Sequence, residues 1–363
     1  MKICYLSDAI SVHTKKWCEF FVDKGYEIVV ISLRNGEIPG VKVYGLGAEG
    51  YYNKGDIAKL NSYTKRIQEV KEIVAMEKPD IVHAHYATSY GILGSCLKFH
   101  PYFLSVWGTD IYTFPNKSFI HKKFLEYNLK KADFVLSTSK DMKREAEKYT
   151  KKEILVTPFG VPIDRFKPMK VDREDVFTVG TIKALIASYG LEYLIRGFKI
   201  FMEKSQDKKA KLLIAGKGEQ EEELKNLAKE LDIEENVHFL GFISEDEVIE
   251  TFNKMDVAVF PSVHQESFGV AAVEAQACGI PAIVSDVGGL TEATKPGYSS
   301  LTVRPESSED IGEAIYKLYK DKDLREEMKK NARQYILDNF NVVDNFNYVD
   351  GLYKKAINSE KVE

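Results

Sequence analysis

The sequence predicts an α/β fold of two Rossmann-like domains, each a doubly wound parallel sheet, facing each other across a cleft. Three observations predict it. Short apolar runs alternate with helical patterns, a proline cluster interrupts the alternation near mid-chain, and a second alternating series follows. Buried strands joined by helical crossovers form a parallel sheet with both faces covered. Ligands of such sheets bind beyond the carboxyl ends of the strands, so we expect the functional residues there.

The first half of the chain holds apolar runs with the length of buried strands. They lie at residues 3–7, 27–32, 41–46, 81–85, 103–107, 134–139 and 154–157. Helical patterns separate most of them, for example at residues 15–24, 57–77 and 118–131. This order is typical of βαβ units and therefore of a parallel sheet.

Three prolines, Pro158, Pro162 and Pro168, then end the regular pattern and indicate a link between domains. Strand candidates of the second series lie at residues 176–181, 211–215, 237–240, 257–260, 281–285 and 300–303. Its helical patterns lie at residues 191–204, 219–231, 245–253 and 269–278, and from residue 308 onward, with a last segment at 342–356. We predict an N-terminal domain over residues 1–164, a C-terminal domain over 172–340 and a closing helix over 341–363.

The composition is that of a globular protein, with 44% apolar and 29% charged residues in 363. No apolar run approaches the roughly 18 residues of a membrane-spanning helix. The first residues read directly as a strand, so we expect no secretory signal. The four cysteines are scattered without a C-x-x-C, which favours a reducing cytoplasm and excludes a structural zinc site.

The most informative segment runs from Glu266 to Pro281. Two glutamates, Glu266 and Glu274, lie on either side of Gly269, which opens a helix that a Gly-x-Pro sequence closes. Unpaired backbone N–H groups at a helix start attract phosphate and other anions. Glu274 lies further into the helix, where it can reach a ribose diol. The segment therefore fits a donor that combines a sugar, a diphosphate and a nucleoside.

The net charge of −4 is unevenly distributed. Basic residues are in excess in the first 160 residues, concentrated around Lys122, Lys130 and the stretch from Lys140 to Lys152. They form either ordinary solvated helix faces or a surface that meets anionic lipid or a pyrophosphate-bearing acceptor. We therefore expect a cytoplasmic protein that can contact an anionic membrane through its N-terminal domain.

Several further motifs occur in a characteristic order. They are Ala132-Asp-Phe-Val-Leu-Ser-Thr-Ser139, Thr157-Pro-Phe-Gly-Val-Pro-Ile-Asp-Arg-Phe166, Leu213-Ile-Ala-Gly-Lys-Gly218, Asn236-Val-His-Phe-Leu-Gly-Phe242, Asp256-Val-Ala-Val-Phe-Pro-Ser262 and Val284-Ser-Asp-Val-Gly-Gly-Leu-Thr-Glu292. Together with the paired glutamates, they resemble the retaining glycosyltransferases of family four, also called glycosyl transferases group 1. The resemblance runs nearly end to end and implies the GT-B fold.

The resemblance implies transfer of a sugar from a nucleotide diphosphate donor, most often a UDP-sugar, with the anomeric configuration retained. It places the donor on the C-terminal domain and a glycan, lipid-linked or other acceptor on the N-terminal domain, in the synthesis of polysaccharide or glycoconjugate. It implies no metal and no other cofactor, because basic side chains and helix ends replace the cation. We expect no nucleic-acid partner.

Catalysis is expected to depend on Lys183 and Glu266. Lys183 follows the first strand of the second series and would stabilise the departing diphosphate. Relatives often have Arg where this chain has Thr181 and a Lys-Gly pair where it has Tyr189-Gly190, so one basic contact is missing or relocated. Glu266 resembles the glutamate that faces the donor sugar, and Glu274 the one that binds the ribose.

The segment Leu240-Gly-Phe-Ile243 resembles the base-binding segment of the family. The remaining donor contacts are expected from this segment and from the start of the helix at Gly269. The full set of expected donor-binding residues is Thr181, Lys183, Gly241, Phe242, Ile243, Glu266, Ser267, Phe268, Gly269, Val270 and Glu274.

Four residues are expected on the acceptor side: His13, His85, Trp107 and Asp110. His83 and His85 share one face of a strand, but the sequence places no third metal ligand beside them. Relatives often have a histidine where Trp107 stands. Tryptophan stacks on a sugar face and donates one N–H but cannot transfer a proton, so Asp110 or His85 is expected to compensate.

Two other functions remain open at this point. One is a UDP-sugar epimerase of similar two-domain fold, against which the paired glutamates argue. The other is a non-catalytic nucleotide-sugar binder, which the substitutions at Thr181 and Trp107 would fit. A dehydrogenase is excluded because no G-x-G-x-x-G follows the first strand.

Overall fold

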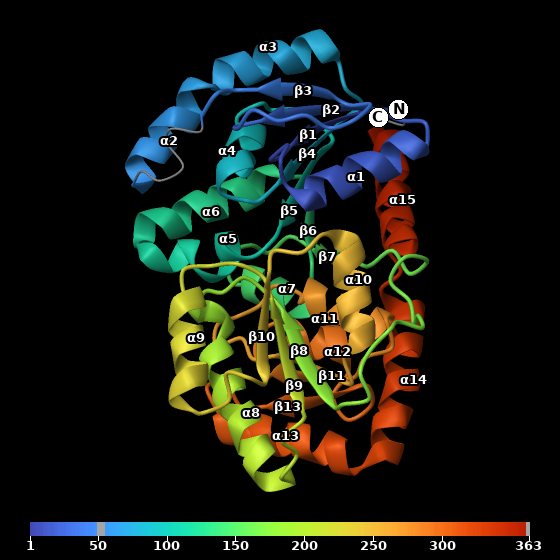
Figure 1. Ribbon diagram of the computed structural model, residues 1–363. Helices are drawn as coiled ribbons and strands as arrows, with labels where there is room; N and C mark the ends of the chain where they lie inside the picture. The colour runs from blue at the N-terminus through green and yellow to red at the C-terminus, as the bar shows by residue number, and fades with distance from the viewer. Residues whose placement is uncertain (49–54, 361–363) are drawn as a thin grey trace. The chain divides into compact units, whose positions relative to one another are not determined.

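The computed structural model describes residues 1–48 and 55–360. The chain divides into two compact units. The N-terminal unit comprises Met1–Phe159 and the segment that starts at Val343, and the C-terminal unit comprises Gly160–Val342. Figure 1 labels the helices and strands of both.

Over its described residues, the N-terminal unit contains a sheet of seven parallel strands in the order β3-β2-β1-β4-β5-β6-β7 (Figure 1). The strands are β1 (Lys2–Leu6), β2 (Glu27–Ser32), β3 (Lys42–Gly45), β4 (Ile81–His85), β5 (Tyr102–Val106), β6 (Phe134–Ser137) and β7 (Ile154–Val156). The helices are α1 (Val12–Asp23), α2 (Asp56–Lys65), α3 (Ile67–Glu77), α4 (Ser89–Ser95), α5 (Thr109–Tyr112), η2 (Phe114–Lys117), α6 (Phe119–Lys131), α7 (Lys140–Ala146) and α15 (Val342–Glu360).

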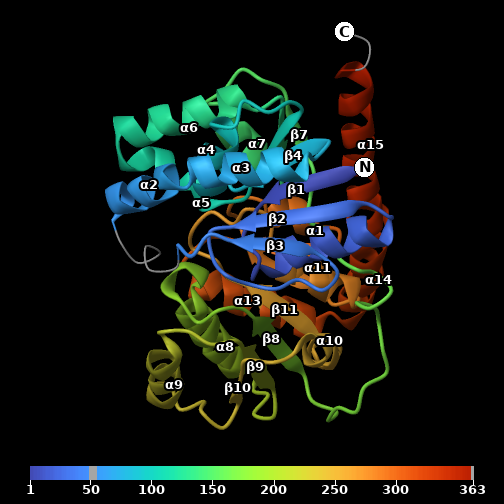
Figure 2. The same ribbon diagram turned by 90° about the horizontal axis from the view of Figure 1, so that it is seen from above.

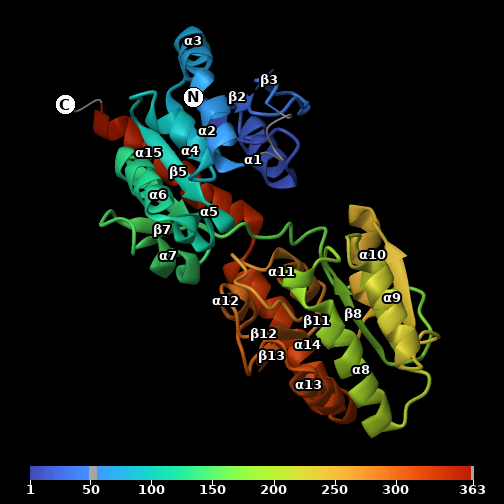
Figure 3. The same cartoon turned by 90° about the vertical axis from the view of Figure 1, so that its left-hand side faces the viewer.

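The C-terminal unit is described completely, and its sheet has six parallel strands in the order β10-β9-β8-β11-β12-β13. The strands are β8 (Thr178–Ile182), β9 (Lys211–Ala215), β10 (Val237–Gly241), β11 (Val257–Phe260), β12 (Ala282–Ser285) and β13 (Ser300–Val303). The helices are η3 (Ala187–Tyr189), α8 (Leu191–Ser205), α9 (Glu221–Glu230), α10 (Glu245–Lys254), α11 (Val270–Ala277), α12 (Leu290–Thr294), α13 (Ser308–Lys320) and α14 (Lys322–Asn339). In Figure 3, α8 and α13 pack together on one face of this sheet.

The sequence prediction of two parallel-sheet α/β domains is confirmed, and every predicted strand is present with its ends within two residues. The single helix predicted over residues 57–77 is wrong. It is broken at Arg66, whose backbone N–H bonds to the carbonyl of Tyr63 in a tightened turn. The Arg66 side chain donates to the carbonyl of Gly47, which anchors the break.

The side chains of β1 alternate between the two faces of its sheet. Leu6 belongs to the core beneath α3 and α4, whereas Tyr5 lies on the opposite face against Trp17 of α1. Helix α15 covers the same face as α1, because Phe346 packs on Trp17 and Tyr353 packs on Phe103 of β5 (Figure 2). The C-terminal helix is therefore part of the core of the N-terminal unit.

A buried histidine fastens α15 to this sheet. Nδ1 of His83 lies 2.5 Å from the hydroxyl of Tyr353, and its Nε2 lies 2.7 Å from Oγ of Ser105. Burial lowers the pKa of His83 to about 3, so the imidazole is neutral in the folded protein. His83 therefore has a structural role.

The strand order reverses once in each sheet. The reversal lies between β1 and β4 in the N-terminal unit and between β8 and β11 in the C-terminal unit. The loops that follow the two central strands then leave in opposite directions and open a crevice at the carboxyl edge. Each unit thus has one such crevice, formed by its own loops.

We predict that acid destabilises the N-terminal unit through its buried histidines. The unfolded chain binds a proton at His83 below pH about 6.5, whereas the folded chain does so only near pH 3. The free energy of unfolding therefore falls as pH drops below about 6.5. The loss is about 1.4 kcal/mol per pH unit for each histidine that is buried and neutral in the folded protein. Urea unfolding followed by tryptophan fluorescence measures it, because both tryptophans lie in this unit.

The variant His83→Gln should reduce the slope of unfolding free energy between pH 6 and pH 5 by about 1.4 kcal/mol per pH unit. His100→Gln is the matched control, since the His100 side chain is exposed. Equal slopes in the wild type and His83→Gln would contradict the assignment of His83 as a neutral core residue.

Candidate functional site

In the C-terminal unit, the crevice holds a partly buried ion pair. Lys183 follows β8 and Glu266 lies in the loop that follows β11, the two strands at which the strand order reverses. Nζ of Lys183 donates to Oε2 of Glu266 at 2.8 Å, and the two side chains are only 9% and 13% exposed. The structure thus brings together the two residues predicted to be catalytic.

Two neighbours hold this pair in place. Oγ of Ser262 donates to the same oxygen of Glu266 at 3.1 Å. The ammonium of Lys183 lies over the ring of Tyr189, 4.1 Å from its centroid, in a cation–π contact. The Tyr189 ring therefore orients the side chain of Lys183.

Two glycine motifs pack against the backbone of the pair. A Cβ on Gly216 would lie 1.9 Å from the carbonyl oxygen of Lys183, and one on Gly288 would lie 2.3 Å from that of Glu266. The N–H of Gly289 donates to the same Glu266 carbonyl at 2.7 Å. Only glycine allows so close an approach, so Gly-Lys-Gly and Val-Gly-Gly position the two charged residues.

Helix α11 begins directly after the loop of Glu266. Gly269 precedes its first residue with a φ of 95°, in the left-handed region that favours glycine. The ring of Phe268 is buried against Phe340, so this residue presents only its backbone to a ligand. Val270 forms the first turn, and Glu274 lies half-buried in the second.

The other expected donor residues lie at the ends of β8 and β10. Thr181 is fully buried, and its hydroxyl has no hydrogen-bond partner among the described residues. Gly241 ends β10, and its carbonyl accepts from the N–H of Gly216 at 2.7 Å, which joins it to the loop beside Lys183. The Phe242 ring is 79% exposed beside it, and Ile243 is half-buried.

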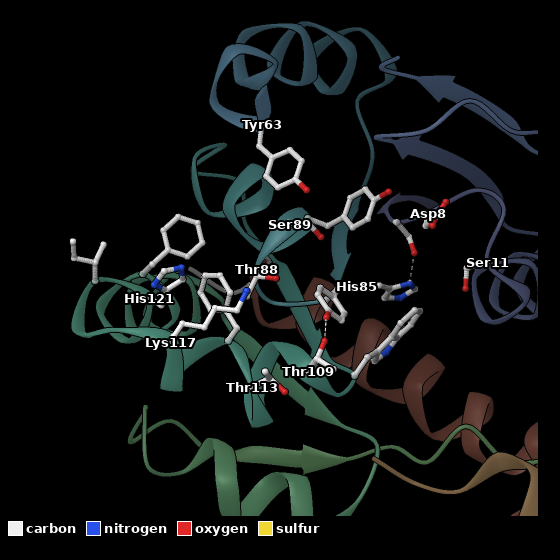
Figure 4. Close-up of a pocket in the computed structure, with 17 residues that line it drawn as sticks. Asp8, Ser11, Tyr63, His85, Thr88, Ser89, Thr109, Thr113, Lys117 and His121 are labelled. Atoms are coloured by element: carbon white, nitrogen blue, oxygen red, sulfur yellow. Dashed lines mark hydrogen bonds between the residues drawn. The ribbon is translucent and has the colours of Figure 1, made fainter. Parts of the chain in front are cut away.

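In the N-terminal unit, a pocket of about 500 Å³ opens at the corresponding edge of the sheet. Its wall is rich in aromatic rings (Figure 4). It is lined by Ser7, Asp8, Ser11, Tyr63, His85, Tyr86, Thr88, Ser89, Tyr90, Trp107, Thr109, Thr113, Phe114, Lys117, Ile120, His121 and Phe124. Figure 4 shows His85 and Ser11 at one end and Lys117 and His121 at the other.

His85 has an unsatisfied nitrogen at this pocket. Its Nδ1 lies 3.0 Å from Oγ of Ser7, which in turn lies 2.7 Å from the hydroxyl of Thr14. Its Nε2 is buried and has no hydrogen-bond partner among the described residues. Burial holds the pKa of His85 well below its usual range, so the ring is neutral at pH 7. A buried nitrogen without a partner is costly and suggests a ligand group.

Two of the expected acceptor-side residues surround His85. The Trp107 ring stacks on the His85 ring with centroids 4.5 Å apart. His13 contacts Trp107 edge-on and stacks on Phe159 at 4.2 Å, and burial lowers its pKa to about 4. His13 is therefore neutral at pH 7 and does not supply a positive charge.

The prediction that the Asp110 side chain lies on the acceptor or cleft side is wrong. Its side chain is fully buried and does not line the pocket. Its carboxylate accepts from the N–H groups of Ala87 and Gly108, both at 2.7 Å, and of Trp107 at 3.2 Å. Asp110 therefore orders the loop that presents Trp107. Burial raises its pKa against the lowering effect of these bonds.

Sequence patterns did not indicate Tyr86. This residue has a φ of 81°, which is rare for a bulky side chain and costs of order 1–3 kcal/mol. Its hydroxyl is hydrogen-bonded to that of Thr109, and both residues line the pocket. Only its position directly after His85, at the end of a central strand, could have indicated it.

The described residues contain no group of three or more His, Cys, Asp or Glu side chains that could hold a metal ion. None of the described helices combines the length and the apolar composition needed to cross a bilayer.

Comparison with known families assigns both units. Residues 2–139 match the profile of the "Glycosyl transferase 4-like" family, and residues 162–335 match that of "Glycosyl transferases group 1". The first match lies within the N-terminal unit and the second within the C-terminal unit.

Two relatives by sequence are also glycosyltransferases. An uncharacterised glycosyltransferase of Methanocaldococcus jannaschii is 26% identical, with 97% of this chain and 94% of the relative covered. A D-inositol 3-phosphate glycosyltransferase of Pseudarthrobacter chlorophenolicus is 26% identical over 75% of this chain and 70% of its own length.

Two solved structures have the same fold. Sucrose-phosphate synthase of Thermosynechococcus elongatus superposes with a TM-score of 0.85 at 19% identity, covering 99% of this chain and 100% of that one. HepE of Anabaena, in complex with UDP and glucose, superposes with a TM-score of 0.77 at 19% identity, covering 98% and 100%. With both units matched and the fold shared along the whole chain, the protein belongs to the group 1 glycosyltransferases, with the GT-B fold.

Proposed function

We propose that the protein transfers a sugar from a UDP-sugar to a glycan or lipid-linked acceptor, with retention of the anomeric configuration. The observation that carries the proposal is the partly buried Lys183–Glu266 pair at the strand-order reversal of the C-terminal unit. The complexes of HepE with UDP and with UDP-glucose support a UDP-sugar as the donor. The resemblance of the Glu266 segment to retaining enzymes supports retention.

The donor diphosphate would lie against Lys183 and the backbone N–H groups at the start of α11. Transfer breaks the bond between C1 of the sugar and the β-phosphate oxygen, and forms a bond between C1 and the acceptor oxygen. The electrons of the broken bond leave with the diphosphate, which also takes up the proton of the acceptor hydroxyl. The ammonium of Lys183 stabilises that growing negative charge, so the step we propose needs no metal ion.

Glu266 has two functions in this scheme. In the free protein its carboxylate is the ion-pair partner of the nearly buried Lys183 ammonium. With the donor bound, its carboxylate faces the sugar, where it holds a hydroxyl or stabilises positive charge at C1. Glu274 would bind the ribose hydroxyls, and the exposed ring of Phe242 would stack on the base.

The acceptor would occupy the pocket of the N-terminal unit. Aromatic walls suit the apolar faces of sugar rings, and Trp107 is placed to stack on one. The unpartnered Nε2 of His85 would bond to an acceptor hydroxyl. This interaction would satisfy a buried nitrogen and orient the attacking oxygen, and it requires no charge on the imidazole.

Glu266→Gln should lower the rate of UDP release from UDP-glucose at least about 10-fold, equivalent to about 1.4 kcal/mol of barrier, and leave the fold intact. The assay needs no acceptor, because slow hydrolysis also releases UDP. Glu313→Gln is the matched control, an exposed glutamate of the same unit paired with Lys204. Unchanged UDP release in Glu266→Gln would exclude Glu266 from the mechanism, and formation of an epimer instead of free sugar would contradict transfer.

Lys183→Ala should weaken the binding of UDP about 10- to 100-fold, because a charge-assisted hydrogen bond of about 1.5–3 kcal/mol is lost. Binding of uridine, which lacks the diphosphate, should not change. Glu266→Gln should bind UDP at least as tightly as the wild type, since the competing carboxylate is removed. Thermal shifts with UDP, GDP and uridine measure these differences. Equal weakening of UDP and uridine in Lys183→Ala would refute the assigned diphosphate contact.

A further inference from the structure

Helix α6 directs unusually apolar side chains toward solvent. Phe119 and Ile120, at its start, are 71% and 76% exposed, and Tyr127 two turns later is 43% exposed. The opposite side of the helix is buried through Leu125 and Leu129. The exposed apolar residues are therefore not needed for packing within the unit.

The exposed face of α6 alternates aromatic rings and lysines. Phe119, Lys123, Tyr127 and Lys131 are spaced four residues apart and lie on one side of the helix. The ammonium of Lys123 lies 5.4 Å from the ring centre of Phe119, and that of Lys131 lies 5.5 Å from that of Tyr127. With Ile120 and Lys130, these residues form what we call the α6 face.

The charge of this region is strongly positive. Residues 117–131 contain five lysines and one acidic residue, Glu126, which is paired with Lys123 at 2.7 Å. A surface that combines exposed rings with an excess of lysine fits the interface of an anionic bilayer, where rings enter the head-group layer and lysines attract anionic lipid.

The α6 face is continuous with the pocket of the N-terminal unit. Ile120 is 76% exposed and also lines the pocket, together with Lys117, His121 and Phe124. The mouth of the pocket therefore lies beside the α6 face. Figure 4 shows Lys117 and His121 at this end and His85 at the far end.

We propose that the α6 face docks the enzyme on an anionic bilayer and that the pocket takes the head group of a lipid-anchored acceptor from that membrane. Phe119 and Ile120 enter the head-group layer, and the lysines bind the anionic lipid heads. The lipid chain leaves the pocket past Ile120, with its phosphate near Lys117 and His121, and its sugar reaches toward His85. The assignment of the acceptor rests on the proposed glycosyl transfer, whereas the docking surface does not.

Vesicle sedimentation tests the docking surface. The wild type should bind vesicles of 7:3 phosphatidylcholine and phosphatidylglycerol at least about 10-fold more tightly than vesicles of phosphatidylcholine alone. Phe119→Ser/Ile120→Ser should lose most of this binding, and Lys123→Glu/Lys131→Glu should weaken it at least about 10-fold. The matched control is Met76→Ser/Tyr348→Ser, which removes exposed apolar side chains elsewhere on the same unit and should bind as the wild type does.

Equal binding to both kinds of vesicle would overturn the docking surface. An equal loss of vesicle binding in the control variant would also overturn it. The UDP thermal shift, measured on the same preparations, separates this failure from that of the proposed function. A normal UDP shift with no vesicle binding refutes only the docking surface. A missing UDP shift in every variant, with vesicle binding intact, refutes the proposed donor site.

A second experiment, a set of thermal shifts, tests which kind of molecule binds in the pocket. Farnesyl phosphate below its micellar concentration should raise the melting temperature of the wild type, and Ile120→Ser should reduce that shift. Inorganic phosphate and farnesol at the same concentration should each give a smaller shift than farnesyl phosphate. An equal shift with inorganic phosphate would assign the pocket to a water-soluble phosphate and overturn the lipid-anchored acceptor.

Discussion

The reversal of strand order in each sheet is the constraint on which the rest of the structure depends. Lys183 and Glu266 are 83 residues apart in sequence. The reversal at β8 and β11 brings Nζ of Lys183 to 2.8 Å from Oε2 of Glu266. At β1 and β4 it places Ser7 beside His85 in the same way. The side chains that chemistry requires converge because parallel strands all end at one edge, and the reversal leaves a crevice there.

The loops around the ion pair depend on glycine for a steric reason. The carbonyls of Lys183 and Glu266 lie so close to Gly216 and Gly288 that no other residue fits. These contacts fix the backbone of the two charged residues, while Ser262 and the Tyr189 ring fix their side chains. An ion pair that is little exposed and held by these contacts is a preorganised charge, which is the form in which electrostatics contributes most to catalysis.

In the N-terminal unit, aromatic stacking and a buried carboxylate order the residues around His85. Trp107 stacks on His85, and the buried carboxylate of Asp110 accepts from backbone N–H groups of the loop that presents Trp107. His85 is neutral at pH 7, and its Nε2 is buried without a hydrogen-bond partner among the described residues. The strained backbone of Tyr86 directly after it shows that the fold maintains this corner at a cost in stability.

The sequence by itself determined the fold class and every strand, because apolar periodicity is a local property of the chain. The resemblance of its motifs to a known family then singled out the two residues of the ion pair. The sequence also selected the helix of Glu274 from its Gly and Pro signals. Only the tertiary structure decided that Asp110 is buried, that Tyr86 and the aromatic pocket lie beside Trp107, and that Phe119 and Ile120 remain exposed on α6. Burial and side-chain partners depend on which distant segments pack together, and no local pattern encodes them.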